Sequence, residues 1–211
     1  MARSLVSRWQ VVPGGAACHR FSRLYIYERS DKEALLETLR EKGYRLESLP
    51  FPVQLWSGRR AVGTPADGIE IEAVTEANFE ECMQVESIAE FGGRKIREKA
   101  FAMEFAHPDF VHYLLRVKGE PASSLCLFRA GQYVRVENVA TLPAYRGQGL
   151  IGHLLHHVQQ EFVRMGGEQL WVCPINDRVE RVYSRYGFET VGQLPFVHAF
   201  LGGAGVLELR A

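Results

Sequence analysis

Four consecutive residues, Arg146-Gly147-Gln148-Gly149, form the strongest candidate for chemistry in this chain. They lie between a strand-like run, residues 134–142, and a helix-like run, residues 151–165. Glycines let successive backbone N–H groups converge on one point, and the start of the following helix adds unpaired donors and a positive dipole end. We therefore predict an anion cradle that suits a pyrophosphate. The alternative for these four residues alone is a tight strand-to-helix turn.

The segments around this loop have the periodicity of a mixed α/β domain. Residues 151–165 carry apolar side chains at helical spacing, and Gly166-Gly167 can end that helix. A helix capped by Thr75 is expected to turn Phe79, Cys82 and Met83 inward. Further helices are predicted over 94–105 and 177–186, and strands over 69–74, 109–117, 123–129, 133–142, 169–173 and 188–201.

Residues 1–60 are predicted to fold as strand, helix and strand. Asp31 can cap the helix, which runs to about Lys42, and Gly43 can end it. The extended pieces are residues 21–27, 44–49 and 53–56, the last two interrupted by Pro50 and Pro52. Residues 57–68, rich in Gly, Arg and Pro, are expected to form a linker.

One internal similarity connects the two ends of the chain. Residues 42–51, KGYRLESLPF, resemble residues 186–196, YGFETVGQLPF, with one inserted residue. Each stretch follows a predicted helix and leads into an apolar strand. Residues 1–66 are therefore expected to be a degenerate partial copy of the βαβ unit that ends the domain at 67–211. The alternative is convergent use of helix, glycine stop and strand.

The composition argues against several classes of partner. With 25 Lys and Arg against 25 Asp and Glu, no net field favours nucleic acid or an anionic membrane. The N-terminus has no apolar run of signal-peptide length, and nowhere do about 18 apolar residues follow one another, so we expect a soluble cytoplasmic protein. A homodimer is left open. The cysteines are far apart and expected to be reduced and packed, at Cys18, Cys82, Cys126 and Cys173.

Two ordered motifs resemble the signatures of the GCN5-related N-acetyltransferase (GNAT) superfamily. Residues 137–150, ENVATLPAYRGQGL, resemble its acyl-CoA-binding signature, in which Arg or Gln, two residues, Gly, one residue and Gly or Ala wrap the CoA pyrophosphate. Residues 176–188, NDRVERVYSRYGF, resemble its second signature, in which Asn is followed seven residues later by Tyr and then by Gly-Phe. The resemblance covers roughly residues 69–200. Ile151 departs from the family pattern, which usually has Gly or Ala there.

The resemblance implies an α/β fold of the α+β type with a mixed, mainly antiparallel sheet flanked by helices. Two neighbouring parallel strands, 133–142 and 169–173, would splay at the cofactor cleft, and a bulge in the first would free backbone groups for the pantetheine arm. The cosubstrate implied is acetyl-CoA. The residues implied to bind it are Val139, Ala140, Thr141, Arg146, Gly147, Gln148, Gly149, Leu150, Ile151, Gly152 and Asn176.

Tyr183 is the candidate general acid. By the family's spacing its hydroxyl would protonate the departing thiolate, and the alternative is an aromatic packing residue on an amphipathic helix. Asn176 would hold the pantetheine amide, and it can also cap its helix.

Glu137 is the candidate general base. A primary amine has a pKa near ~10, so a base or water chain must accept its proton at neutral pH. On an ideal strand Glu137 shares one face with Arg135, Val139 and Thr141. The alternative for Glu137 is an ion pair with Arg135 or a neighbouring strand.

These assignments predict an N-acetyltransferase that moves an acetyl group from acetyl-CoA to a primary amine by direct attack in a ternary complex. A single active site is expected, in the C-terminal half. The alternative is a noncatalytic acyl-CoA-binding regulatory module. No motif identifies the amine acceptor.

The histidines and a basic cluster invite other interpretations. A solvated or CoA-flanking surface is favoured over a metal site at His153, His156 and His157, because they flank the core stripe of a helix, and no metal is predicted. His107 and His112 are isolated in the sequence. The arginines 178, 181 and 185 either solvate the last helix or meet the CoA 3′-phosphate or an acidic substrate.

Overall fold

The computed structural model describes residues 22–26, 30–59, 67–88, 93–201, 205 and 207–208 of the 211-residue chain. The chain divides into two compact units, one formed by residues 1–52 and 192–211 and the other by Val53–Val191. The expected division was 1–66 and 67–211; here the residues after 191 are grouped with the N-terminal segment and residues 53–66 with the second unit. Cys18, Phe21, Tyr27 and most of the expected linker lie outside the described residues.

The first unit is a small antiparallel arrangement with one helix. Its strands are β1 (Ser22–Ile26) and parts of β2 (Arg45–Trp56) and β8 (Phe188–Leu201), in the order β1-β8-β2. Helix α1 (Lys32–Glu41) follows the expected bounds, and it buries Leu36 and Leu39 against Ile26 and Ala199. The apolar side chains that recur on one face of α1 therefore hold the helix against the strands.

Strand β2 corrects one expectation. Residues Arg45–Trp56 form one continuous strand through Pro50 and Pro52, rather than two interrupted pieces. Proline fixes φ near a value that an extended chain can adopt and removes only its own N–H donor, so it need not end a strand.

The internal similarity corresponds to similar local structure. Both stretches follow a helix, and the second residue of each is a glycine with positive φ, +80° at Gly43 and +84° at Gly187. The matching phenylalanines, Phe51 and Phe196, stack within the first unit with ring centroids 4.6 Å apart. These features fit both a degenerate repeat and convergence on the same helix, glycine and strand solution.

The second unit contains a mixed sheet with strands in the order β2-β7-β6-β5-β4-β3. Neighbouring strands are antiparallel except β6 and β7, which are parallel. This is the mixed α/β fold expected from the sequence. The strands not yet defined are β3 (Ile69–Ala73), β4 (Phe110–Val117), β5 (Glu120–Ala130), β6 (Tyr133–Thr141) and β7 (Gln169–Val172).

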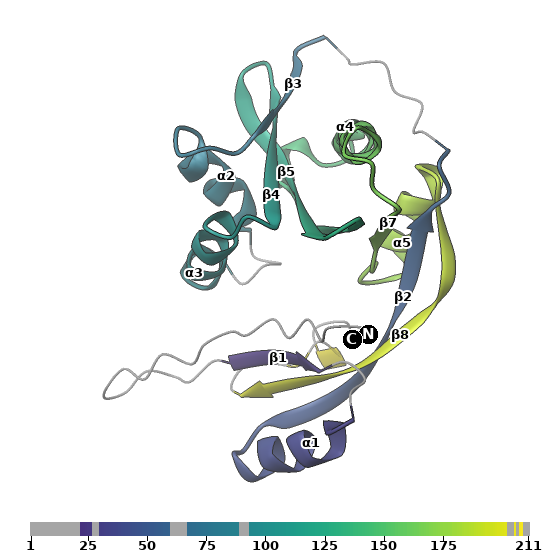
Figure 1. Ribbon diagram of the computed structural model, residues 1–211. Helices are drawn as coiled ribbons and strands as arrows, with labels where there is room; N and C mark the ends of the chain where they lie inside the picture. Colours follow the sequence, from purple (N-terminus) through teal and green to yellow (C-terminus); the bar gives the residue numbers. More distant parts are fainter. Residues whose placement is uncertain are drawn as a thin grey trace. The chain divides into compact units, whose positions relative to one another are not determined.

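Helices cover both faces of this sheet. Figure 1 shows α2 (Phe79–Glu86) and α3 (Arg94–Phe105) on one side of β4 and β5, and α4 (Leu150–Arg164) on the other. The Tyr183 ring of α5 (Asp177–Arg185) belongs to the apolar cluster on the α4 side. Among the described helices, none is both long and apolar enough to cross a membrane.

Helix α4 illustrates how the sequence builds this fold. Its buried positions, Leu150, Leu154, Leu155, Val158 and Phe162, recur at helical spacing and fill the cluster beneath the sheet. Burying one such side chain stabilises the fold by about 1.5–3 kcal/mol. The helix ends as expected at a positive-φ glycine, where Gly166 and Gly167 N–H groups bond the carbonyls of Val163 and Phe162.

Helix α2 begins later than expected. Its first residue is Phe79 and its N-cap is Asn78, so Thr75 does not cap it. Asn78 instead accepts a hydrogen bond from the Thr75 backbone N–H through Oδ1 at 2.7 Å, which folds the turn before the helix. The inward orientation of Cys82 and Met83 is as expected, since both are fully buried.

Candidate functional site

The expected cradle is an exposed turn at the start of α4. A short 3-10 turn, Pro143–Tyr145, leads into Gly147 with φ +78° and Gly149 with φ +75°. Within the described part of the chain, the N–H groups of residues 147–151 donate no hydrogen bond. Arg146 anchors the turn, because its Nε donates to the Thr141 carbonyl at 3.1 Å. Five consecutive unpaired donors at a helix N-terminus form an arrangement that can hold an anion.

Gly152 has a second explanation besides the cofactor. Its N–H donates to the Gly149 carbonyl at 2.8 Å, so this donor is used inside the turn. A Cβ at this position would lie 2.6 Å from the Tyr186 hydroxyl oxygen and 2.7 Å from a ring carbon. Gly152 therefore permits close packing of Tyr186 on α4, and its expected contact with the cofactor stays a prediction.

Strand β6 contains the bulge implied by the family resemblance. Ser124 pairs with Ala140 and Cys126 pairs with Glu137, so Asn138 and Val139 together stand opposite Leu125. Asn138 has φ +48°, in the left-handed region. The extra residue reverses the alternation of side chains.

This bulge overturns one expectation about faces. Val139 packs against the apolar cluster on the α4 side, whereas Glu137 pairs with Cys126 toward α2 and α3. The prediction that Glu137 and Val139 share one face is therefore wrong, because it assumed an ideal strand. Ala140 and Thr141 are tied to β5 by Ser123, whose Oγ donates to the Ala140 carbonyl at 2.6 Å and lies 2.8 Å from Thr141 Oγ1.

The parallel strands lose their pairing next to the bulge. The β6–β7 ladder runs from Tyr133 opposite Gln169 to Val136 opposite Val172. There β7 ends, while β6 continues to Thr141. The bulged part of β6 thus extends beyond the ladder with β7.

Glu137 forms the ion pair with Arg135 that the sequence allowed. Arg135 in turn stacks its guanidinium over Trp171, 5.2 Å from the ring centroid, and over Phe128. Burial raises the pKa of the Glu137 carboxyl, and the neighbouring Arg135 charge opposes that rise. A carboxyl with a raised pKa is a better match for proton transfer near neutral pH. Its role as base stays a prediction.

Tyr183 lies at the core end of α5. The residue is 4 % exposed, and its ring packs edge-to-face against Phe188 with centroids 5.6 Å apart. Its hydroxyl makes no hydrogen bond to another described residue. Burial raises the pKa of Tyr183, and the Glu137 carboxylate raises it further, so the phenol keeps its proton at neutral pH. Packing and proton donation are both compatible with this position.

Asn176 caps α5. Its side-chain Oδ1 accepts a hydrogen bond from the Val179 N–H at 3.0 Å, as expected for an N-cap residue. The side-chain amide is exposed, which leaves its N–H donors for a ligand.

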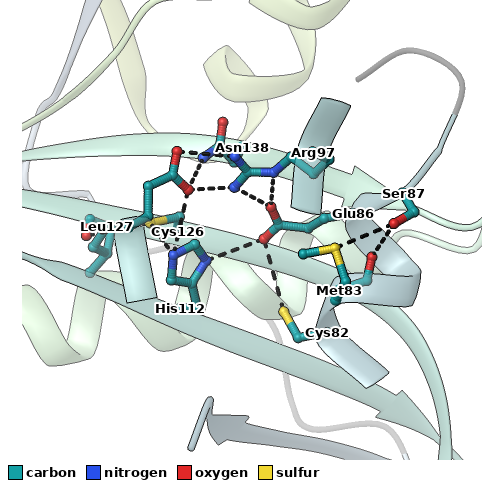
Figure 2. Close-up of polar contacts among 10 residues, drawn as sticks. Cys82, Met83, Glu86, Ser87, Arg97, His112, Cys126, Leu127 and Asn138 are labelled. Atoms are coloured by element: carbon teal, nitrogen blue, oxygen red, sulfur yellow. Dashed lines mark hydrogen bonds and ion pairs between the residues drawn. The ribbon is translucent and has the colours of Figure 1, made fainter. Parts of the chain in front are cut away.

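A buried charged network lies between the sheet and helices α2 and α3, and it was not predicted from the sequence. Arg97 donates to both Glu86 and Glu104, through Nε at 2.7 Å and Nη1 at 3.0 Å respectively. His112 Nδ1 lies 3.2 Å from Glu86 Oε1. Figure 2 shows His112, Glu86 and Arg97 pointing toward one another. The sequence position of His112 had suggested that it was isolated. The structure corrects this: His112 belongs to the network.

The network offers three groups of metal-ligand type, but a cation already stands among them. Ligand atoms of Glu86, Glu104 and His112 lie within 4.8 Å of one another. The Arg97 guanidinium bonds both carboxylates, and these contacts outweigh the effect of burial and raise the pKa of Arg97. An always-charged guanidinium therefore balances these acids.

Two signals in the sequence point to this network in hindsight. Arg97, Phe101 and Glu104 recur at helical spacing, so two charged residues share a face with a core phenylalanine. Asn is one of the few residue types that tolerate positive φ, so an Asn inside a predicted strand, such as Asn138, can indicate a bulge. Asn138 also bonds Glu104 of the network.

The remaining candidates are placed as follows. The arginines 178, 181 and 185 are exposed on α5. The histidines of α4 are partly buried, and His157 packs edge-to-face against Tyr113 at 4.9 Å. The described cysteines, Cys82, Cys126 and Cys173, are free, and burial raises the pKa of each thiol.

Several solved structures are similar to this chain in fold. A functionally unknown conserved protein from Staphylococcus epidermidis is 17% identical, with a TM-score of 0.62 over 86% of this chain and 73% of that one. A GNAT-family protein described as a putative acetyltransferase from Novosphingobium aromaticivorans is 20% identical, with a TM-score of 0.56 over 88% and 75%. A GCN5-related N-acetyltransferase from Kribbella flavida is 23% identical, with a TM-score of 0.51 over 87% and 68%.

The sequence itself matches a family model. No curated protein matches the chain. The model described as "Acetyltransferase (GNAT) family" matches residues 75–188, which include the bulged strand, the cradle and α5. The chain belongs to the GNAT family of acetyltransferases.

Proposed function

We propose that this protein is an N-acetyltransferase that moves an acetyl group from acetyl-CoA to a primary amine by direct attack in a ternary complex. The observation that carries the proposal is the run of five unpaired N–H groups at the start of α4, beside the end of the β6–β7 ladder. Backbone donors at a helix N-terminus suit a pyrophosphate. The exposed Asn176 amide and the bulged backbone of residues 139–141 suit the amides of a pantetheine arm.

The chain's own residues would handle two protons. Acetyl-CoA would supply the thioester carbonyl as electrophile and the thiol as leaving group. Glu137 would accept the proton that the attacking amine loses, directly or through water. Tyr183 would donate its hydroxyl proton to the departing sulfur, and the raised pKa of Tyr183 supports a protonated phenol at neutral pH.

A noncatalytic acyl-CoA-binding module is the competing proposal, because it needs only the cradle. The two are separated by measuring CoA release from acetyl-CoA with a panel of amines: small amines, amino acids, an aminoglycoside and peptides with free N-termini. Transfer to any one of them, confirmed by mass spectrometry of the acetylated product, supports the enzyme. Tight binding of acetyl-CoA without transfer to any amine supports the module.

Tyr183→Phe tests the acid. It removes only the hydroxyl, so we expect slower transfer with unchanged affinity for acetyl-CoA. The expected loss is about 10²-fold or more in kcat, the usual contribution of a general acid. Tyr133→Phe is the matched control, since Tyr133 is 49% exposed at the start of β6. Equal kcat for wild type and Tyr183→Phe would remove the role assigned to the hydroxyl.

A further inference from the structure

The bulge of β6 is fastened to the buried charged network by one side chain. Asn138 Nδ2 donates to Glu104 Oε2 at 3.0 Å. Glu104 is itself held by Arg97, which also bonds Glu86 on α2. Figure 2 shows Asn138 at one side of this group and Glu86 and His112 at the other. The chain of contacts therefore connects α2 and α3 to the residue that follows Glu137.

The backbone at Asn138 needs such support. Its φ of +48° lies in the left-handed region, which strains most residues other than glycine. A short amide side chain tolerates it, and a hydrogen bond to a buried, ion-paired carboxylate can hold it in place. The exposed fraction of Glu104 is 9%, so water offers the amide little competition.

The same network contributes to the electrostatics of Glu137. Burial is the main cause of the raised pKa of the Glu137 carboxyl; the Arg135 charge lowers that pKa, the Glu104 charge adds to the rise, and Arg97 lowers it. The other titratable or charged groups that face Glu137 or complete the network are Cys126 on β5, Cys173 after β7, Tyr183 on α5, Glu86 on α2 and His112 on β4. Of the carboxylates of the network, Glu104 is the one that also accepts a hydrogen bond from Asn138 in the bulge.

We propose that Glu104 is a positioning residue for acetyl transfer: its carboxylate, ion-paired with Arg97, holds the bulge of β6 through Asn138 and so holds Glu137, the residue before Asn138, in place. The inference rests on the proposed function, because it assigns a purpose to the base. Glu104 need not touch either substrate. It acts through Asn138 and Glu137, which belong to the strand that would carry the reaction.

The first experiment reads Glu137 directly and needs no turnover. Glutamate carboxyl carbons are labelled with ¹³C, and the Glu137 signal is identified by its loss in Glu137→Gln. Glu104→Gln keeps the length of the side chain and an oxygen acceptor for Asn138 but removes the charge. We expect the midpoint of the Glu137 titration to move to lower pH, because the like charge that raised it is gone.

Glu98→Gln is the matched control, since it makes the same change on the same helix at a side chain that is 57% exposed. Its Glu137 midpoint should equal that of the wild type, because exposed charges are screened. An unmoved midpoint in Glu104→Gln overturns the coupling of Glu104 to Glu137. This result is independent of whether any amine is acetylated, so it differs from a failure of the proposed function.

A second variant tests the bulge without disturbing the ion pairs. Asn138→Gly adopts positive φ without strain and deletes only the amide that Glu104 binds. With whichever amine the wild type acetylates, we expect kcat to fall by about 10- to 100-fold and the affinity for acetyl-CoA to stay within about twofold, as for a misplaced reacting group. When kcat is measured against pH in the same assay, the acid limb of the profile should lie at lower pH for Glu104→Gln than for the wild type. A wild-type kcat in Asn138→Gly would refute the positioning role.

Discussion

Gly187 is the glycine of the second family signature. The structure gives two separate physical reasons why a larger residue does not fit there. Its φ is +84°, in the region that disfavours side chains. A Cβ would lie 2.4 Å from the Arg59 carbonyl oxygen, a backbone atom that cannot rotate away. Its own carbonyl accepts hydrogen bonds from the Ser57 N–H and hydroxyl, both at 2.9 Å. Gly187→Ala should therefore separate the turn before β8 from residues 57–59.

The expected magnitude follows from these terms. Left-handed backbone costs alanine about 1–2 kcal/mol. Overpacking against a fixed group adds about 1–3 kcal/mol. Gly187→Ala should therefore lower the free energy of unfolding by about 2–5 kcal/mol. Gly58→Ala provides the matched control, because Gly58 also has φ +84° but nothing lies within 4 Å of its Cβ. The control should lose only the first term, about 1–2 kcal/mol.

Urea denaturation followed by tryptophan fluorescence measures both variants. A thermal scan gives a second reading, with about 2–4 °C of melting temperature per kcal/mol for a chain of this size. The two glycines share the same φ, but Gly187 is buried against the Arg59 carbonyl and bonded by Ser57, whereas Gly58 is exposed with open space around its Cβ. Equal destabilisation of Gly187→Ala and Gly58→Ala would refute the packing argument and leave backbone strain alone.

Two further predictions concern the cradle and a thiol. Gly149→Ala, at φ +75° with open space for its Cβ, should weaken acetyl-CoA binding measured by calorimetry by roughly tenfold or more, because the N–H groups of the cradle reorient. Gly131→Ala, at φ +65° in an open turn, is the control and should bind acetyl-CoA as the wild type does. Equal affinities of the two variants would exclude the cradle. Burial raises the pKa of Cys173 to about 11, so in a Cys18→Ser background iodoacetamide should label the native protein at pH 8 far more slowly than free cysteine, and faster as pH rises toward 11. Labelling at the rate of free cysteine would contradict that burial.

Much of the fold could be predicted from the sequence because its signals are local. The apolar spacing of α4 and the glycines that end α1 and α4 act within a few residues, so their elements appear almost where expected. The cradle is also local, since Gly147 and Gly149 take positive φ in the turn itself. β2 was predicted less well, because proline removes a backbone donor and so lowers strand propensity, whereas pairing with neighbouring strands continues the strand through Pro50 and Pro52.

The sequence by itself determined where an anion could bind, which family the signatures resemble and which residues, Tyr183 and Glu137, are candidates for proton transfer. Only the tertiary structure decided what surrounds them. One extra residue in β6 moved Val139 to the other face, which no alternation rule anticipates. Packing of α2 and α3 on the sheet brought Glu86, Arg97, Glu104 and His112 together from separate segments. Charges become buried partners only when distant elements exclude water around them, and that exclusion is a property of the packed fold rather than of any short stretch of sequence.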